Sequence, residues 1–223
     1  MKRKIIVTAD GSKTIQIEDW NEQYHSIHGA VQEAYHVFIK SGFWHVQTDE
    51  HPLRILEMGF GTGLNALITL HEADKQGVSV AYVGIERYPV SLEEALQLEY
   101  PEILKVSSSE AVYRKMHEIS WETPHQLTPN FGLLKCQKDF FDVNQSSLFN
   151  LVYFDAFGAR VQPEVWTVAL FEKMYSALKS NGVLVTYSAK GSVRRALQEV
   201  GFVVERLPGP PGKREMLRAT KKE

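Results

Sequence analysis

A glycine turn between an apolar run and a helix-forming run constrains the fold of this chain more than any other feature. The turn reads Glu57-x-Gly59-x-Gly61-x-Gly63. Glycine accepts a positive φ without steric cost, so glycines at alternate positions let the backbone turn sharply and approach a ligand closely. The helix that follows presents free N–H groups at its start. We therefore expect a strand, a ligand-binding turn and a helix, the first unit of an α/β sheet.

Short apolar runs alternate with helical patterns downstream, which predicts a Rossmann-like parallel sheet with helices on both faces. The predicted strands are residues 53–58, 78–85, 133–137, 148–154 and 182–188. The predicted helices are residues 63–75, 89–99, 163–179 and 191–200. Residues 100–132 exceed the length of one crossover, and we expect an insertion with short helices there.

The last two apolar runs, 202–207 and 215–220, predict an antiparallel hairpin. Only a Pro/Gly-rich segment separates them, which is too short for a crossover helix. Parallel strands finished by such a hairpin are the layout of class I methyltransferases, whereas a dehydrogenase domain would end with a sixth parallel strand. The predicted fold class is therefore α/β, of the class I methyltransferase type.

The N-terminal part reads as a small extension. Two β-prone runs flank Asp10-Gly11 within residues 5–17, which predicts a hairpin. Apolar residues recur at helical spacing over residues 27–43, with Gly42 available to end the helix. We expect a hairpin and helix extension at 1–50 and a Rossmann-like domain at 51–223.

Composition excludes several classes of protein. With 223 residues, 43% of them hydrophobic, the chain can bury a full core. It has no run of roughly 20 apolar residues and no secretory leader, so we expect a cytoplasmic protein without a membrane segment. The one cysteine, Cys136, lies in an apolar run and is expected in the core. The histidines form no metal-binding motif, and no metal is predicted.

Charge is unevenly distributed along the chain. The formal net charge is −2, yet residues 179–223 contain ten Lys or Arg against four Glu. This predicts either a basic C-terminal face or a solvated basic tail.

The spacing of the glycine turn indicates its ligand. A dinucleotide fingerprint needs G-x-G-x-x-G, but Leu64 stands three residues after Gly61. Glu57 at the head of the turn suits the ammonium of an amino acid better than a pyrophosphate. The turn therefore predicts S-adenosylmethionine, bound through its methionine part, and the alternative is a turn that only packs helix on strand.

Two further acids lie at the ends of predicted strands. Glu86 can accept hydrogen bonds from ribose hydroxyls, unless it is an ordinary surface residue. Asp139 is placed to face the adenine amino group, and Asp142 is an equal alternative. The predicted cofactor-binding residues are Glu57, Gly59, Phe60, Gly61, Thr62, Gly63, Asn65, Glu86, Asp139 and Asp155.

The fourth predicted strand ends at Asp155, with Phe157 and Trp166 nearby. A carboxylate at this edge can orient an amine and take its proton, and aromatic faces can stack on a flat base. These three residues are the predicted catalytic and acceptor-pocket residues. The alternative is that Asp155 caps the next helix and the aromatic residues belong to the core.

These motifs together resemble the tRNA 5-aminomethyl-2-thiouridine methyltransferases over nearly the whole chain. The matching segments are Tyr24-His25-Ser26-x-x-Gly29-Ala30 with Glu33 and Val37-Phe38, the turn Glu57 to Asn65, Gly84-x-Glu86, Asp155-Ala156-Phe157 with Pro163-Glu164-x-Trp166, and Gly212-Lys213-Arg214-Glu215-Met216. The segment Gly158-Ala159-Arg160-Val161-Gln162 departs from the family, which often has a proline and an Asn there.

The resemblance implies methylation of the exocyclic amine of a modified wobble uridine in the tRNA anticodon loop, giving the 5-methylaminomethyl form. It implies the stand-alone methyltransferase form, with a separate oxidoreductase as a possible source of the precursor amine. Tyr24 and His25 then contact substrate or anchor the extension. The residues implied as phosphate contacts are Lys190, Arg194, Arg195, Lys213 and Arg214.

Two other functions stay open. A small-molecule amine methyltransferase or a polyamine-synthase relative fits the same scaffold and the modest net charge. A domain that binds the cofactor only as a scaffold for a partner protein also fits.

Overall fold

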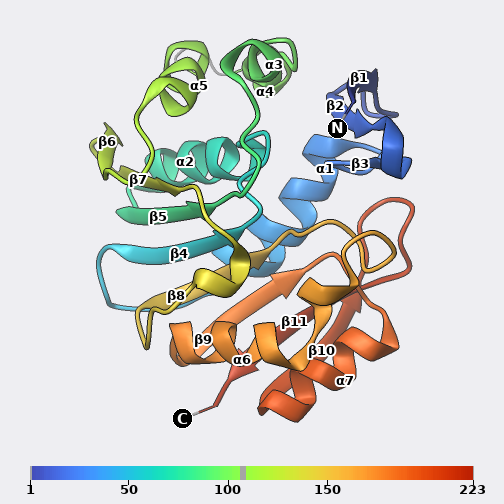
Figure 1. The fold of residues 1–223 in the computed structure, drawn as a ribbon. Helices are drawn as coiled ribbons and strands as arrows, with labels where there is room; N and C mark the ends of the chain where they lie inside the picture. The colour runs from blue at the N-terminus through green and yellow to red at the C-terminus, as the bar shows by residue number, and fades with distance from the viewer. Residues whose placement is uncertain (1, 106–108, 223) are drawn as a thin grey trace.

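A computed structural model describes residues 2–105 and 109–222. Within them a central eight-stranded sheet has the order β10-β11-β9-β8-β4-β5-β7-β6 (Figure 1). Strands β9, β8, β4, β5 and β7 are mutually parallel, as predicted. The strand bounds are β4 Leu53–Met58, β5 Val80–Ile85, β6 His125–Thr128, β7 Phe131–Cys136, β8 Phe149–Phe154, β9 Leu178–Thr186, β10 Phe202–Pro208 and β11 Glu215–Lys221.

The predicted C-terminal hairpin is confirmed. Strand β11 lies between β9 and β10 and runs antiparallel to both, with Leu217 opposite Thr186 on one side and Arg206 on the other. Because β11 starts beside the end of β9, the loop of residues 209–214 lies at the carboxyl edge of the parallel strands. The predicted fold class, a class I methyltransferase sheet, is confirmed by this topology.

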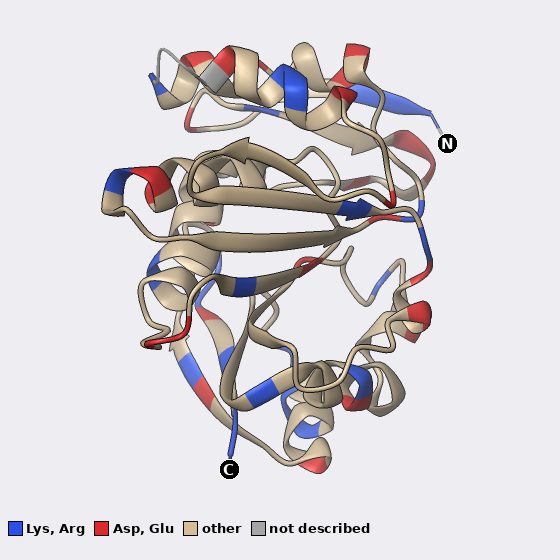
Figure 2. Cartoon of the chain, turned by 90° about the vertical axis from the view of Figure 1, so that its left-hand side faces the viewer, with Lys and Arg blue, Asp and Glu red and all other residues tan. Residues whose placement is uncertain are grey.

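The sheet separates two hydrophobic cores because successive side chains of a strand point to opposite faces. Ile55 of β4 belongs to the core under α2 and the N-terminal helix, and Leu56 belongs to the core under α6 and α7. The helix bounds are α2 Leu64–Gln76, α3 Leu92–Leu96, α4 Tyr100–Leu104, α5 Ser109–Glu118, α6 Val168–Ala177 and α7 Gly191–Val200. Charged residues lie mainly on the outer helices and loops, and the central strands are largely uncharged (Figure 2).

Two predicted helices are shorter than expected. The helix expected at 89–99 is α3, which starts at a capping box between Ser91 and Glu94 and ends before Glu99, whose φ is 54°. The helix expected at 163–179 is divided, because Thr167 is extended, with φ −108° and ψ 160°. Residues Pro163–Trp166 form a separate 3-10 turn before α6.

The insertion contains the expected short helices, α4 and α5, and one strand that the sequence did not reveal. Strand β6 pairs antiparallel with β7 and forms the edge of the sheet. The segment Thr128-Pro129-Asn130 between them has the composition of a tight turn. Residues 106–108 of this predicted insertion lie outside the described residues.

The N-terminal extension forms a small separate sheet. Strands β1 (Arg3–Val7) and β2 (Lys13–Ile17) make the predicted hairpin, and β3 (Glu22–Gln23) adds a short third strand. The helix α1 (Ala30–Ala34) continues as a π-helix, η2 (Tyr35–Phe43).

Gly42 lies within this helix and does not end it. A Cβ there would lie 3.0 Å from Val185 Cγ2, so glycine allows the helix to approach the sheet closely. No helix of the described residues is long and apolar enough to cross a membrane.

Candidate active site

A cavity of about 580 Å³ opens at the carboxyl edge of the parallel strands. Its walls come from the loops that follow β4, β5, β7, β8 and β9, from the loop between β10 and β11, and from the N-terminal extension. In open α/β sheets this edge is where ligands bind, because the loops after successive strands converge there.

The glycine turn after β4 has the backbone that its sequence predicted. The φ angles are 100° at Gly59, 49° at Gly61 and 73° at Gly63, all in the left-handed region. A Cβ at Gly59 would lie 2.6 Å from the Asp155 carbonyl oxygen, so only glycine permits the turn to pack against the end of β8. The Gly61 N–H donates to Glu86 Oε2 at 3.0 Å, which ties the turn to the end of β5.

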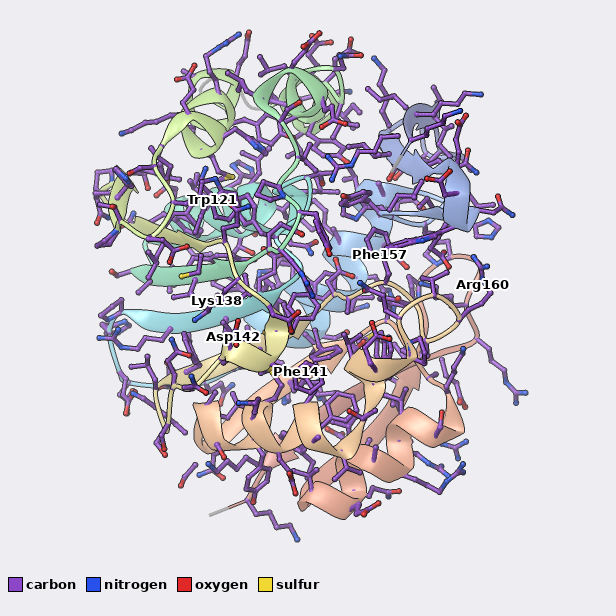
Figure 3. The ribbon with its side chains drawn as sticks, viewed as in Figure 1. Trp121, Lys138, Phe141, Asp142, Phe157 and Arg160 are labelled. Atoms are coloured by element: carbon purple, nitrogen blue, oxygen red, sulfur yellow. The ribbon has the colours of Figure 1, made fainter. Side chains whose placement is uncertain are left out.

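Of the acids predicted to contact adenosine, Glu86 and Asp139 line the cavity. Burial raises the pKa of Glu86. Asp139 Oδ2 pairs with Arg87 at 2.5 Å and its Oδ1 accepts the Phe141 N–H, which caps the 3-10 turn of residues 140–142. Asp142, the alternative to Asp139, lies on that turn beside Phe141, is exposed, and is absent from the described cavity lining (Figure 3).

Asp155 follows β8 and reaches the cavity wall. Asn65 Nδ2 donates to Asp155 Oδ2 at 2.8 Å and to Glu57 Oε1 at 2.9 Å. Burial, reinforced by the charge of Glu33, raises the pKa of Asp155 to about 7, while Asn65 and Lys213 oppose the rise. Glu57 is fully buried, and burial raises its pKa too. Asp155 can therefore exchange a proton near neutral pH.

Aromatic residues surround the loop after Asp155. The Phe157 ring meets Tyr24 edge to face at 4.9 Å between centroids and Trp20 at 5.6 Å, so it lies toward the N-terminal sheet (Figure 3). Trp166 packs against Phe154 in the core, and its Nε1 donates to the Phe157 carbonyl at 2.8 Å. Trp166 thus supports the loop from behind.

The N-terminal extension covers the cavity. Glu33 accepts a hydrogen bond from the Ser26 N–H at 2.9 Å and forms an ion pair with Lys213. The Lys213 ammonium also lies 3.8 Å from the centre of the Tyr187 ring. These contacts join the N-terminal extension to the loop between β10 and β11. The two segments are far apart in the sequence.

The structure divides the predicted site residues into three groups. Eleven line the cavity: Tyr24, His25, Gly59, Phe60, Gly61, Thr62, Glu86, Asp139, Asp155, Phe157 and Lys213. Four are absent from the described lining and lie close behind it: Glu57, Gly63, Asn65 and Trp166. Four more are outside the described lining, on α7, at its start, or in the last hairpin: Lys190, Arg194, Arg195 and Arg214.

Sequence reasoning missed several lining residues, among them Glu22, Ser26, Phe140, Phe141 and Tyr187. Tyr187 directly follows β9, so its position at a strand end was the available signal. Ser26 lies in a loop, Glu22 on the short strand β3, and Phe140 and Phe141 on the 3-10 turn after β7, and packing decides which of these side chains face the cavity. Cys136 is free and buried, as predicted.

The cavity lining carries an excess of acidic groups. Its carboxyl groups belong to Glu22, Glu33, Glu86, Asp139, Asp155 and Glu164. Its Lys and Arg side chains are Arg87 and Lys213, and each is already paired with one of these acids. Burial lowers the pKa of His25 to about 4, so this residue is neutral at pH 7. Glu22 is paired too, with Arg160 outside the described lining at 3.1 Å. Among the lining acids, Glu86, Asp155 and Glu164 form no ion pair with a described residue, and these three carboxyl groups favour a cationic ligand.

A class I fold with a glycine turn and acids at the strand ends is typical of S-adenosyl-L-methionine-dependent methyltransferases. The model of a family described by that name matches residues 109–222, and the chain belongs to this family. S-Adenosyl-L-methionine is its cofactor. No group of three or more His, Cys, Asp or Glu side chains in the described part of the chain could hold a metal ion.

Individual relatives are also similar. The chain is 32% identical to the tRNA 5-methylaminomethyl-2-thiouridine biosynthesis bifunctional protein MnmC of Aromatoleum aromaticum, over 89% of this chain and 32% of that protein. It is 28% identical to uncharacterized protein MJ0670 of Methanocaldococcus jannaschii, over 90% of this chain and 54% of that protein. The chain thus spans about half or less of these relatives.

A solved structure shares the fold. The structure of MNMC2 from Aquifex aeolicus superposes with a TM-score of 0.79 at 24% identity, covering 99% of this chain and 70% of that chain.

Proposed function

We propose that this chain methylates the exocyclic amine of a 5-aminomethyl-(2-thio)uridine at the tRNA wobble position, giving the 5-methylaminomethyl form. The observation that carries the proposal is the position of Asp155, a carboxyl group with a pKa near 7 in an acid-rich cavity bordered by aromatic side chains. Similarity to a tRNA-modifying bifunctional protein supports the RNA substrate.

The residues around the glycine turn fit the cofactor. Gly59 and Gly61 expose left-handed backbone in the cavity wall. Among the described residues, Glu57 Oε2 and Asn65 Oδ1 are buried acceptors without a hydrogen-bond partner, which suits an ammonium donor. We assign the methionine part to this region and the ribose and adenine to Glu86 and Asp139. When bound, the cofactor supplies the methyl group on its sulfonium.

Asp155 is the proposed acceptor-site residue. A primary amine must present its nitrogen lone pair, and its nitrogen gives up one proton once the new N–C bond has formed and the S–C bond to the methyl group has broken. The Asp155 carboxylate orients the amine and takes this proton, since its pKa near 7 makes it a better base than an ordinary Asp. Phe157 and Tyr24 supply ring surfaces against which a flat base can pack.

The acidic lining also constrains how RNA binds. Phosphate groups are repelled by this lining, so only an extruded base enters the cavity, and the anticodon loop costs only a few kcal/mol to unstack. Phosphates then lie on the basic groups around the start of α7 and the last hairpin. Lys190, Arg195 and Arg214 are exposed there, and we propose them as phosphate contacts.

The decisive test incubates the protein with labelled S-adenosylmethionine and tRNA that lacks the final methyl group. We expect label on the wobble uridine. We expect Asp155→Asn to lower the rate by about 100-fold. Asp142→Asn, an exposed acid outside the lining, is the matched control and should leave the rate within about twofold. Absence of label on that nucleoside would overturn the proposal.

A small-molecule amine or polyamine is the second candidate substrate, because an acid-rich cavity also suits a free cation. Salt discriminates between the two substrates. The KM for tRNA should rise steeply with added salt, because RNA binding releases counterions, whereas the turnover of a small amine should depend little on salt.

A domain that acts only as a scaffold for a partner protein, without enzymatic function, would be indicated if the Asp155→Ala variant kept the function in cells. A separate oxidoreductase as supplier of the amine stays part of the proposal.

A further inference from the structure

Thr62, the residue between the last two glycines of the turn, is held from two sides. Its hydroxyl lies 2.7 Å from His25 Nε2 of the N-terminal extension. Its carbonyl oxygen accepts the Tyr113 hydroxyl at 2.8 Å and His117 Nε2 at 3.2 Å, both from α5 of the insertion. Two segments outside the core of the α/β sheet therefore meet on one residue of the cofactor-binding turn.

These contacts fix the plane of one peptide group. The Thr62 carbonyl points to α5, and the N–H of the same peptide, on Gly63, donates to the Phe60 carbonyl at 2.8 Å. The carbonyl and the N–H of the Thr62–Gly63 peptide group are therefore both hydrogen-bonded, directly before the first residue of α2. A Cβ on Gly63 would lie 3.2 Å from His117 Nε2, so α5 is packed directly against the turn.

The His117 side of this contact is itself supported. Lys135 of β7 donates to the His117 carbonyl at 3.0 Å and lies 4.8 Å from the centre of the Trp121 ring. Trp121 meets Phe60 of the turn edge to face at 6.2 Å and lies on the β7 side of the sheet (Figure 3). Burial, followed by the charge of Lys135, lowers the pKa of His117 to about 4, so its ring is neutral and Nε2 carries the donated proton.

We infer that Tyr113 and His117 are positioning residues for the cofactor, and that the insertion serves to set the conformation of the glycine turn. They act through Thr62, by holding its carbonyl in the orientation that the turn needs when it binds S-adenosylmethionine. This inference depends on the cofactor of the family and not on the proposed tRNA substrate.

Binding of S-adenosylhomocysteine, measured by calorimetry, tests the inference without any acceptor. We expect Tyr113→Phe, which removes one oxygen, and His117→Leu each to weaken binding about tenfold, because each removes one hydrogen-bond donor to the Thr62 carbonyl. His117→Gln, whose amide can replace the Nε2 donor, should bind within about threefold of the wild type. His125→Leu, on β6 of the same insertion, is the control and should bind like the wild type.

Steady-state kinetics separate positioning from general damage. The KM for S-adenosylmethionine should rise in parallel with the binding constant, while kcat at saturating cofactor and the KM of the acceptor stay within about twofold. Unchanged binding in Tyr113→Phe and His117→Leu would overturn the inference, and so would an equal loss of acceptor affinity. If His117→Leu does not fold, Tyr113→Phe alone decides.

Discussion

Asn65 is hydrogen-bonded to Asp155, with 2.8 Å between Nδ2 of the first and Oδ2 of the second. The same nitrogen donates to Glu57 at 2.9 Å, so one amide serves the buried carboxyl group of Glu57 and the half-buried one of Asp155. Asn65 lies in the first turn of α2 and Asp155 just after β8. This amide therefore connects the helix that follows the glycine turn with the proposed acceptor site.

Asn65→Leu should reduce methylation most strongly at low pH. The amide lowers the pKa of Asp155, and its loss leaves that group protonated to a higher pH. If Asp155 takes the proton of the amine, kcat at pH 7 should fall by about fivefold and recover partly at pH 8.5. A pH–rate profile of the variant tests this expectation, and an equal loss at every pH would contradict it.

Glu33→Gln and Lys213→Met should move the pH–rate profile in opposite directions. The Glu33 charge raises the pKa of Asp155 and the Lys213 charge lowers it. Rate rises with pH as Asp155 loses its proton, so Glu33→Gln should shift the acid limb of kcat to lower pH and Lys213→Met to higher pH. Profiles measured at saturating tRNA and cofactor would show this, and shifts of the same sign would refute the assignment of the base.

Trp166→Phe should loosen the acceptor loop. The variant keeps an aromatic ring but loses the hydrogen bond to the Phe157 carbonyl and leaves a small void. We expect the free energy of unfolding to fall by about 1 to 3 kcal/mol and kcat/KM to fall about tenfold. Denaturant unfolding and steady-state kinetics measure the two effects, and an unchanged kcat/KM would separate Trp166 from the site.

His25 should make the protein less stable in mild acid. Burial holds its pKa at about 4, below the ordinary value of 6.5, so between these two pH values the unfolded chain binds the extra proton. The contribution of His25 to stability is therefore full above about pH 6.5 and is lost as pH falls toward 4, with a limiting slope of about 1.4 kcal/mol per pH unit. The free energy of unfolding of the wild type and of His25→Gln, measured at several pH values, isolates the contribution of His25. Identical pH dependences of the two proteins would argue against this contribution.

Removing two basic groups at the start of α7 should affect tRNA and not the cofactor. Lys190→Gln with Arg195→Gln removes two exposed charges outside the described cavity lining. The KM for tRNA should rise. The slope of log KM against log salt concentration should fall by about two, because about two phosphate contacts are lost. Calorimetry with S-adenosylhomocysteine supplies the control, and an unaltered salt slope would remove these residues from the RNA interface.

Much of the fold was decided by local sequence. Glycine at 59, 61 and 63 is required by left-handed backbone, and the apolar runs place each parallel strand within a few residues of its position. The short Pro/Gly segment after Pro208 allowed only an antiparallel return. The turn, the strand ends and therefore Glu86, Asp139 and Asp155 follow from these local rules, because loops after parallel strands converge at one edge.

Only the tertiary structure decided which side chains face the cavity. Trp166 and Asn65 belong to the motifs of the predicted site. Packing nevertheless places both behind the described lining, where they donate hydrogen bonds to Phe157 and Asp155. The pairing of Glu33 with Lys213 joins segments 180 residues apart. Such contacts depend on how the extension and the last hairpin pack over the sheet. Sequence spacing describes local conformation and carries no information about these long-range distances. The acids at the strand ends were therefore predictable from local rules, whereas Tyr24, His25 and Lys213 entered the prediction only through the family resemblance.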